Sequence, residues 1–571
     1  MFKKSPKNCF KPVLPSSTYH SSHEGVATAA AASSAATELH KSSNNGPLLT
    51  YFNYFLLPQV DISVSDTNYI PIELCVTPRN DEPNQVYVSS SIYTHLCDIK
   101  QQIEKYQDTW DSIKKFTNPY EYIHSNITGN KTNISKLRPL SRSFYKMIEI
   151  IKNNNILSQY QHTFAQRAES KMGIKTFHLA EGPGGFIEAI AYLRGLEYQQ
   201  RFNHSNTTAV PAAAAPDNET NASSSSPIHI LKRNTEFHDE YMKEQEYLKV
   251  SRRIFDTQKP ASGVTPMALY GNDRYYGMTL VNDDPICPGW KKTRTFLENN
   301  PNVIIENGAD KTGNLISLEN FLYCAEKYKN KMDIVTADGG FDFSVDFNHQ
   351  ETMATQLILC EVFYALAIQK RGGSFILKIF DVFHKATVDI LYILSYYYHQ
   401  VSIIKPYTSR IANSEKYVVC QGFKINDSTQ IIRQFASIFE TIQKSLSGGD
   451  GGSDGCGGGN GDGLSSLLPF DHDLYFLNKI EDMNAMVSFQ QIENITSTLS
   501  IITNHRNSEK LEQYKRSNVN KCIAWCEKYE IPHNAQHACF QSTNIFLHKS
   551  IPAAASVSAA VASAVVATEP Q

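Results

Sequence analysis

Three charged side chains lie at the ends of predicted strands. Asp338 follows the buried run 332–337, Lys378 lies near the end of the run 372–379, and Glu415 leads into the run 416–420. In open α/β sheets, ligands bind at the carboxyl ends of the strands, where the strand order reverses. An amine beside carboxylates can hold a ligand hydroxyl and exchange a proton with it. A lysine and an aspartate at this edge therefore predict a ligand site, because folding alone explains them poorly.

A glycine-rich turn is the second element that must lie at this edge. The apolar run 176–180 leads into Glu181-Gly182-Pro183-Gly184-Gly185, and an amphipathic segment begins at Phe186. Glycines lack a Cβ, so the backbone can bend sharply and a ligand can approach its amides. This strand–turn–helix pattern is typical of a nucleotide site in a parallel α/β sheet. Taken alone, it also fits a tight connection that binds nothing.

The segment ahead of the turn is locally basic. Residues 131–175 contain nine lysines and arginines and only two acids, Glu149 and Glu169. Phosphate groups need such a surface, since much of nucleic-acid affinity is electrostatic. An ordinary solvated helix face is the competing interpretation, but the position just before the first core strand favours a functional one.

These segments together resemble the FtsJ-like ribose 2'-O-methyltransferases, most closely the branch that methylates mRNA caps. The resemblance covers residues 138–425 and rests on motifs in the family's order, the run 405–420 being the most cap-enzyme-like. It implies a Lys-Asp-Lys-Glu tetrad around the reacting hydroxyl, with S-adenosylmethionine over the glycine turn. The tetrad members are Lys146, Asp338, Lys378 and Glu415.

The resemblance also implies the binding residues. The S-adenosylmethionine contacts are expected at Glu181, Gly182, Pro183, Gly184, Gly185, Phe186, Asp283, Asp310 and Asp338. Asp283 follows the predicted second strand 277–281, where a carboxylate usually holds a ribose diol, although an Asn/Asp-rich turn explains it equally well. Asp310 is a candidate acceptor for the adenine amino group. RNA contacts are expected at Arg142, Ser143, Arg410, Asn413 and Ser414, and no metal is expected.

Two features depart from the family pattern. The turn begins with His178-Leu179-Ala180-Glu181, where many methyltransferases have Asp-x-Gly. A low-complexity excursion, about residues 195–270, also interrupts the domain, although crossovers between neighbouring strands are usually short.

The implied chemistry is methyl transfer to a ribose hydroxyl, which is a poor nucleophile at neutral pH. The site must align oxygen, methyl and sulfur and help to remove a proton. Burial and the nearby Lys146 are expected to lower the pKa of Lys378 well below its usual value of about 10.4. Asp338 is expected to hold the Lys378 ammonium, while Lys146 and Glu415 fix the hydroxyl. Whether Lys378 takes the proton or steers an oxygen lone pair stays open.

Three functions compete. The first is 2'-O-methylation near the 5' cap of mRNA, the second is the same reaction on ribosomal RNA, and the third is RNA binding without catalysis. The intact tetrad argues against the third. A cap-guanine pocket would use aromatic stacking, and Trp290, beside Lys291 and Lys292, is the one candidate for it.

The predicted fold is α/β: a Rossmann-like seven-stranded methyltransferase sheet with helices on both faces, low-complexity insertions and a helical C-terminal tail. The 48–130 region shows strand-like residues 85–88 and a helix-like run 92–116. Within the sheet domain, Glu361 is expected to be solvated or paired and not catalytic. The predicted segments are a disordered tail 1–47, an accessory region 48–130, the methyltransferase domain 131–425, a linker 447–466, a helical region 467–545 and a low-complexity tail 551–571.

Composition limits the partners and the compartment. A net charge of −3 is no global nucleic-acid signature, and no apolar run reaches the length of a membrane span. Eleven cysteines without paired spacing predict reduced thiols and an intracellular protein of the nucleus or cytoplasm. Cys522 and Cys526, near His533, His537 and Cys539, suggest zinc, but a helix that packs its cysteines is the preferred interpretation.

Overall fold

The computed structural model describes residues 53–60, 70–77, 85–160, 173–208, 272–281, 289–340, 348–447, 463–504 and 508–535. Several predictions fall on other residues: the tail 1–47, most of the excursion 195–270, Asp283, most of the linker 447–466, and the tail 551–571. They lie outside the described residues.

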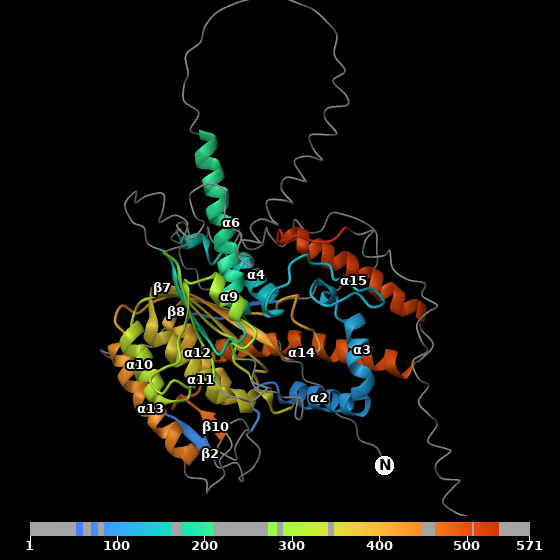
Figure 1. The fold of residues 1–571 in the computed structure, drawn as a ribbon. Helices are drawn as coiled ribbons and strands as arrows, with labels where there is room; N and C mark the ends of the chain where they lie inside the picture. The colour runs from blue at the N-terminus through green and yellow to red at the C-terminus, as the bar shows by residue number, and fades with distance from the viewer. Residues whose placement is uncertain are drawn as a thin grey trace, which may run out of the picture. The chain divides into compact units, whose positions relative to one another are not determined.

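A mixed sheet of eight strands forms the centre of the fold (Figure 1). Its spatial order is β1-β8-β9-β7-β6-β3-β4-β5. The strands are β1 (Tyr54–Leu56), β3 (Lys175–Leu179), β4 (Arg274–Met278), β5 (Val303–Ile305), β6 (Met332–Ala337), β7 (Gln369–Ile379), β8 (Tyr398–Ile404) and β9 (Lys416–Phe423). The run from β5 to β7 is parallel, whereas β9 is antiparallel to both β7 and β8. The Rossmann-like methyltransferase sheet is confirmed, with one additional edge strand, β1, antiparallel to β8.

The strand order reverses between β3 and β6. The chain runs from β3 to β4 on one side and later returns to β6 on the other side, with Leu179 opposite Ala337. The residues that follow these strands, the glycine turn and Asp338, therefore leave the sheet side by side. The Asp338 N–H donates to the Leu179 carbonyl at 3.2 Å. This is the edge at which α/β sheets bind ligands.

Helices cover both faces of the sheet because its inner strands are apolar on both sides. Neighbouring residues of β6 and β7, such as Ile334 and Val335, belong to opposite cores. One core contains α10 (Leu318–Tyr328), α11 (Gln350–Ile368), α12 (Lys385–Tyr397) and α13 (Thr429–Ser447). The other contains α4 (Ser143–Asn153), α6 (Gly185–Thr208), α9 (Arg294–Asn299) and α15 (Ser508–Lys528). The prediction of helices on both faces is confirmed.

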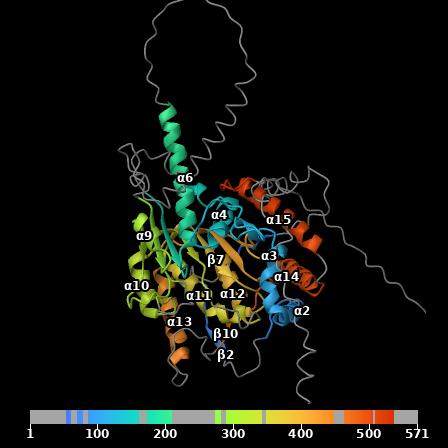
Figure 2. The ribbon, with the colours of Figure 1, turned by 45° about the vertical axis from the view of Figure 1, so that its right-hand side comes forward.

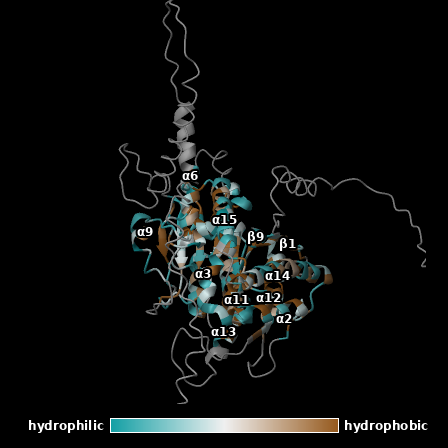
Figure 3. Cartoon of the chain, turned by 90° about the vertical axis from the view of Figure 1, so that its right-hand side faces the viewer, coloured by the Kyte–Doolittle hydropathy of each residue, from teal (hydrophilic) through white to brown (hydrophobic). Residues whose placement is uncertain are grey.

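Of the described helices, α11 alone is long and apolar enough to cross a membrane. It lies at the hydrophobic centre of the molecule (Figure 3), and 78% of its apolar window is buried there. A core helix of a sheet protein has the same properties, so this helix is weak evidence for a membrane span.

Segments from both ends of the described chain pack together beside the sheet (Figure 2). The N-terminal elements are β2 (Cys75–Thr77), α2 (Ser90–Gln101), η2 (Gln102–Tyr106), α3 (Gln107–Thr117) and η3 (Glu121–Ile123). The C-terminal ones are β10 (Gly463–Ser466), α14 (Leu474–Thr503) and α15. β2 pairs with β10, and Asn494 on α14 donates to the Thr117 carbonyl at 2.9 Å. The helical C-terminal region is therefore confirmed.

Two predictions for the N-terminal region are wrong. Residues 85–88 form no strand, because the N–H groups of Tyr87 and Val88 both donate to the single carbonyl of Phe383. The helix expected over 92–116 is interrupted by the 3-10 turn η2.

The cysteines of α15 have a packing role. Cys522 and Cys526 are fully buried, and the Cys522 thiol donates to the Pro119 carbonyl at 3.4 Å. Among the described residues, no group of three His, Cys, Asp or Glu side chains gathers as metal ligands would. His537 and Cys539 lie outside the described residues.

Candidate active site

The four residues of the predicted tetrad lie together at the carboxyl edge of the parallel strands. Lys146 comes from α4, Asp338 directly follows β6, Lys378 is the penultimate residue of β7, and Glu415 directly precedes β9. Because β9 runs antiparallel beside β7, with Lys378 opposite Tyr417, the start of β9 lies next to the end of β7.

The tetrad consists of two ion pairs. The Lys146 Nζ lies 2.5 Å from Glu415 Oε1, and the Lys378 Nζ lies 3.2 Å from Asp338 Oδ1. Lys378 also donates to the Asp338 carbonyl at 2.7 Å. The four side chains are between 6% and 16% exposed, so the site is recessed but can be reached from solvent.

Tyr417 joins the two ion pairs, and the sequence reasoning missed it. Its hydroxyl donates to Asp338 Oδ1 at 3.1 Å and accepts from Lys146 Nζ at 3.5 Å. Burial and the charges of Asp338 and Glu415 raise its pKa well above the usual value, so it remains a donor. Its position two residues after Glu415, in a strand, was the available signal.

The charges of the site stabilise one another. Burial opposes ionisation of Glu415, but Lys146, Lys378 and Arg142 outweigh burial and lower its pKa. The pKa of Lys146 is lowered, first by burial and also by Arg142, against the attraction of Glu415.

The pKa predicted for Lys378 is wrong in direction. Burial does act to lower it, as expected, but Asp338, Glu415 and Glu361 are all close enough to outweigh burial, so the pKa is raised. Lys378 is therefore a stable ammonium group in this arrangement.

The glycine turn connects β3 to α6, and its shape and packing require glycine at two positions. Gly184 has a φ of 102°, which favours glycine. A Cβ on Gly185 would lie 2.2 Å from Ser141 Oγ and 2.3 Å from Ser143 Oγ, so its absence lets the start of α4 pack against the turn. This contact fixes the helix that carries Lys146 relative to the turn.

Some of the predicted cofactor contacts have partners within the fold, and others are accessible to a ligand. Glu181 is buried, and its Oε1 accepts the N–H of the fully buried Phe186. Its Oε2 lies 3.3 Å from His178 Nδ1 and has no hydrogen-bond partner among the described residues. Asp310 accepts hydrogen bonds from Thr312 and Asn320, which outweigh desolvation and lower its pKa. The partly exposed backbone of Gly182 and Pro183, beside Asp338, remains accessible to a ligand.

Two buried polar atoms near the ends of β4 and β5 could form hydrogen bonds with a bound ligand. The Nε1 of Trp290 and the Oδ1 of Asn307 have no hydrogen-bond partner among the described residues. The Trp290 ring lies against the turn, 3.3 Å from a Cβ built on Gly184. A donor and an acceptor beside a glycine turn suit a nucleoside, so this edge fits S-adenosylmethionine. Asn307 lies two residues after the end of β5, and its position just after this apolar run was its sequence signal.

Four of the five predicted RNA contacts form side-chain hydrogen bonds or ion pairs with other described residues, whereas Arg142 does not. Arg410 forms a bidentate ion pair with Glu121 at 2.9 and 2.7 Å. Ser143 bonds to Ser141, and Ser414 donates to Gln350 at 2.7 Å. The Asn413 side-chain oxygen accepts from Lys405 at 3.0 Å. By contrast, the half-buried guanidinium of Arg142, at the start of α4, makes no hydrogen bond or ion pair within the described part of the chain.

Glu361 on α11 lies behind the site. Contrary to the expectation that it is solvated or paired, it is fully buried and forms no ion pair with the described residues. Its Oε1 accepts the Gly339 N–H at 3.1 Å, while its Oε2 has no hydrogen-bond partner among them. Burial raises its pKa to about 8, against the attraction of Lys378. Glu361 thus supports the turn that follows Asp338.

Glu361 predicts a specific pH dependence of stability. Because its folded-state pKa is raised, the folded protein keeps a proton that the unfolded chain releases above about pH 4.3. The free energy of unfolding should therefore fall between about pH 5 and 8, by up to about 1.4 kcal/mol per pH unit from this group. Chemical denaturation at several pH values should show a shallower fall for Glu361→Gln, and an unchanged one for the exposed Glu493→Gln. Equal slopes in wild type and Glu361→Gln would contradict this.

Comparisons with known proteins agree with this geometry. The FtsJ-like methyltransferase family model matches residues 263–423. The cap-specific mRNA (nucleoside-2'-O-)-methyltransferase 1 of Trypanosoma brucei brucei is 31% identical over 197 residues, which are 34% of this chain and 49% of that protein. The protein of the same name from Dictyostelium discoideum is 38% identical over 127 residues, 21% of this chain and 17% of that protein. The chain thus matches about half or less of the length of these relatives.

A solved ribosomal RNA methyltransferase from Plasmodium falciparum is also similar. It is 16% identical, covers 50% of this chain and 97% of its own, and has a TM-score of 0.25. At that score the similarity adds nothing to the sheet order described above.

Proposed function

Because the chain carries an FtsJ-like methyltransferase domain, we propose that it transfers a methyl group from S-adenosylmethionine to a ribose 2'-hydroxyl of RNA, near the 5' cap of mRNA. The observation that carries the proposal is the pair of ion pairs joined by Tyr417, beside the glycine turn. The printed names of the relatives support the cap as the substrate.

Different residues of the site would bind the cofactor, position the ribose and accept the hydroxyl proton. S-adenosylmethionine, when bound, supplies an electrophilic methyl group. Gly182, Pro183, Trp290 and Asn307 would hold it, and Lys146 with Glu415 would position the ribose. The Lys378 ammonium would donate to the ribose hydroxyl oxygen and leave its free lone pair available for attack. The Asp338 carboxylate would accept the proton that the hydroxyl loses and pass it to water.

The raised pKa of Lys378 favours steering over proton removal, and the two differ in their pH dependence. A neutral-amine base would make the rate rise about tenfold per pH unit below its pKa. With steering, single-turnover rates at saturating substrates should stay within roughly twofold between pH 7 and 9, because the ammonium persists throughout. A tenfold rise per unit would instead assign proton removal to Lys378.

Arg142 is the predicted RNA contact that the arrangement supports best. Its guanidinium is half-buried near the tetrad and uncommitted among the described residues, and guanidinium groups bind phosphate bidentately. Arg410, Asn413 and Ser414 would act by shaping the loop that carries Glu415, and Ser143 by holding the glycine turn.

Ribosomal RNA is the alternative substrate, and RNA binding without catalysis is the alternative function. The intact tetrad argues against the latter. Methyl transfer from labelled S-adenosylmethionine should be measured on matched capped and uncapped short RNAs, with the modified nucleotide identified. Preference for the capped RNA supports the proposal, equal labelling favours a different RNA, and no labelling contradicts the proposed reaction. An RNA substrate would locate the protein in the nucleus or the cytoplasm.

A further inference from the structure

The loop that carries Glu415 is held mainly by side chains from distant parts of the chain. This Glu415 loop, residues 405–415, connects β8 to β9. Inside it, Lys405 Nζ donates to the Glu415 carbonyl at 2.9 Å and Ser409 Oγ to Glu415 Oε1 at 2.9 Å. Most of its other backbone contacts reach outward.

Four side chains from outside the loop, Glu149, Glu121, Asn118 and Gln491, fix successive positions of it. Glu149, three residues after Lys146 on α4, accepts the N–H groups of Tyr407 and Thr408 at 2.7 and 3.3 Å. Glu121 forms an ion pair with the Arg410 side chain, and Asn118 Oδ1 accepts the Ile411 N–H at 3.1 Å. Gln491 Nε2 donates to the Ala412 carbonyl at 2.9 Å.

These anchors come from both accessory regions. Asn118 and Glu121 follow α3, and Gln491 lies on α14, all outside the matched residues 263–423. Trp525 on α15 adds an indirect contact, because its Nε1 donates to Glu149 Oε2 at 3.2 Å. Gln491, Asn118 and Glu121 are all buried, so these contacts are shielded from water.

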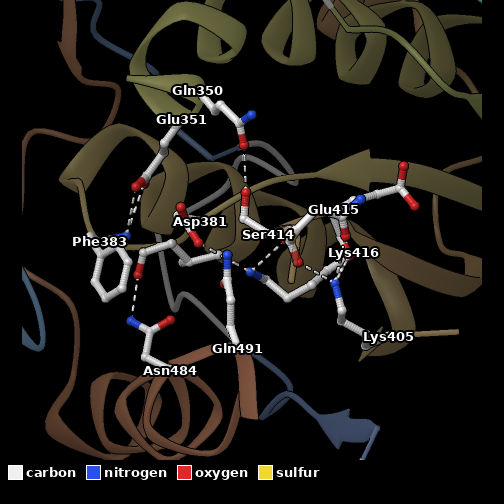
Figure 4. A network of polar contacts seen from close by, with 12 residues as sticks. Gln350, Glu351, Asp381, Phe383, Lys405, Ser414, Glu415, Lys416, Asn484 and Gln491 are labelled. Carbon is white, nitrogen blue, oxygen red and sulfur yellow. Dashed lines mark hydrogen bonds and ion pairs between the residues drawn. The ribbon is translucent and has the colours of Figure 1, made fainter. Parts of the chain in front are cut away.

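The same regions hold the neighbouring loop after β7 (Figure 4). Lys100 on α2 forms a buried ion pair with Asp381 at 2.7 Å, and Lys416 lies 3.8 Å from the same carboxylate. Lys416 also donates to the Ser414 carbonyl, while Asn484 on α14 donates to the Val382 carbonyl at 2.6 Å. The two loops that flank the site are thus joined to helices α2 and α14.

We propose that these N- and C-terminal helices form a brace whose function is to position Glu415 for methyl transfer, with Gln491, Asn118 and Glu121 as positioning residues. The inference rests on the proposed function. A catalytic group that is misplaced by about 1 Å loses roughly 100-fold in rate, and the Glu415 loop has little regular structure of its own to prevent this. The accessory regions are therefore part of the enzyme's catalytic unit.

The test uses the full chain with Gln491→Met, which keeps the side-chain length but deletes the donor to Ala412. Asn478→Met, an exposed position on the same helix, is the matched control. Single-turnover methyl transfer to capped RNA should slow roughly tenfold in Gln491→Met, whereas its Kd for S-adenosylmethionine should stay within about twofold. The control should match wild type. If Gln491→Met does not fold, Trp525→Phe carries the same test through Glu149.

A double-mutant cycle separates positioning from general stability. In a Glu415→Gln background, Gln491→Met should cause no further loss of rate, because both changes act on the same group. Wild-type rates in Gln491→Met, or losses that add in full, would overturn the brace while leaving the proposed function intact. An inactive wild type, or a fully active Glu415→Gln, would instead contradict the proposed function.

Discussion

Lys378→Met is expected to slow methyl transfer by about 100- to 10,000-fold. The side chain keeps its length but loses the ammonium group that contacts the Asp338 carboxylate and carbonyl at 3.2 and 2.7 Å. Without it, nothing else in the tetrad is placed to direct the hydroxyl oxygen from the β7 side. Single-turnover kinetics with saturating S-adenosylmethionine and RNA would measure the loss.

The matched control is Lys370→Met on the same strand. Lys370 pairs with Asp333 at the opposite end of β7 and is partly exposed, so its removal should leave the rate near that of wild type. Binding of S-adenosylmethionine should survive in Lys378→Met, since the glycine turn is untouched. A Lys378→Met protein that binds both substrates and turns over like wild type would exclude the proposed role of this lysine.

Asp338→Asn should lower the rate of methyl transfer at least about 100-fold, although asparagine is nearly isosteric with aspartate. Asp338 provides the largest favourable charge for the Lys378 ammonium, and its Oδ1 accepts from the Tyr417 hydroxyl. The amide removes the charge and disturbs both contacts. The pKa of Lys378 should also fall, so the residual rate should gain a dependence on pH that the wild type lacks.

Asp427→Asn is the control for Asp338→Asn, because Asp427 pairs with Lys329 at the surface, away from the site. It should retain the wild-type rate and pH profile. If Asp338→Asn keeps its thermal stability and also the wild-type rate, the charge at position 338 has no role in the chemistry.

The fold was predictable where local pattern determines it. The buried runs of β6 and β7 and the glycine turn after β3 each have a sequence signature, and parallel strands bring their ends together. The edge strand β1 has only three residues, and all three are hydrophobic although Tyr54 and Leu56 are exposed, so its sequence shows no alternation of polar and apolar residues. Residues 85–88 alternate like a strand, yet the N–H groups of Tyr87 and Val88 both donate to the Phe383 carbonyl and not to the residues of a neighbouring strand.

The positions of Asp338, Lys378 and Glu415 were predictable for the same reason, whereas Lys146 on α4 was implied by the family resemblance alone. The electrostatics of the four residues were not predictable. The pKa of Lys378 is raised mainly by Asp338 and Glu415, and Glu361, which lies on a helix and not at a strand end, adds to their effect. Glu361 is the single charged residue in the apolar run 357–369, a signal that distinguishes it from the solvated or paired residue it was taken to be. Contacts such as Gln491 to Ala412 join residues far apart in the chain and leave no local pattern.

We propose that the two ion pairs joined by Tyr417 form one site for methyl transfer to a ribose 2'-hydroxyl. The most direct test compares two short capped RNAs that differ only in whether the acceptor nucleotide carries a 2'-hydroxyl or a 2'-hydrogen. With labelled S-adenosylmethionine, the full chain should label the hydroxyl RNA alone, on the ribose oxygen. Equal labelling of both RNAs, or label on a base, would contradict this account.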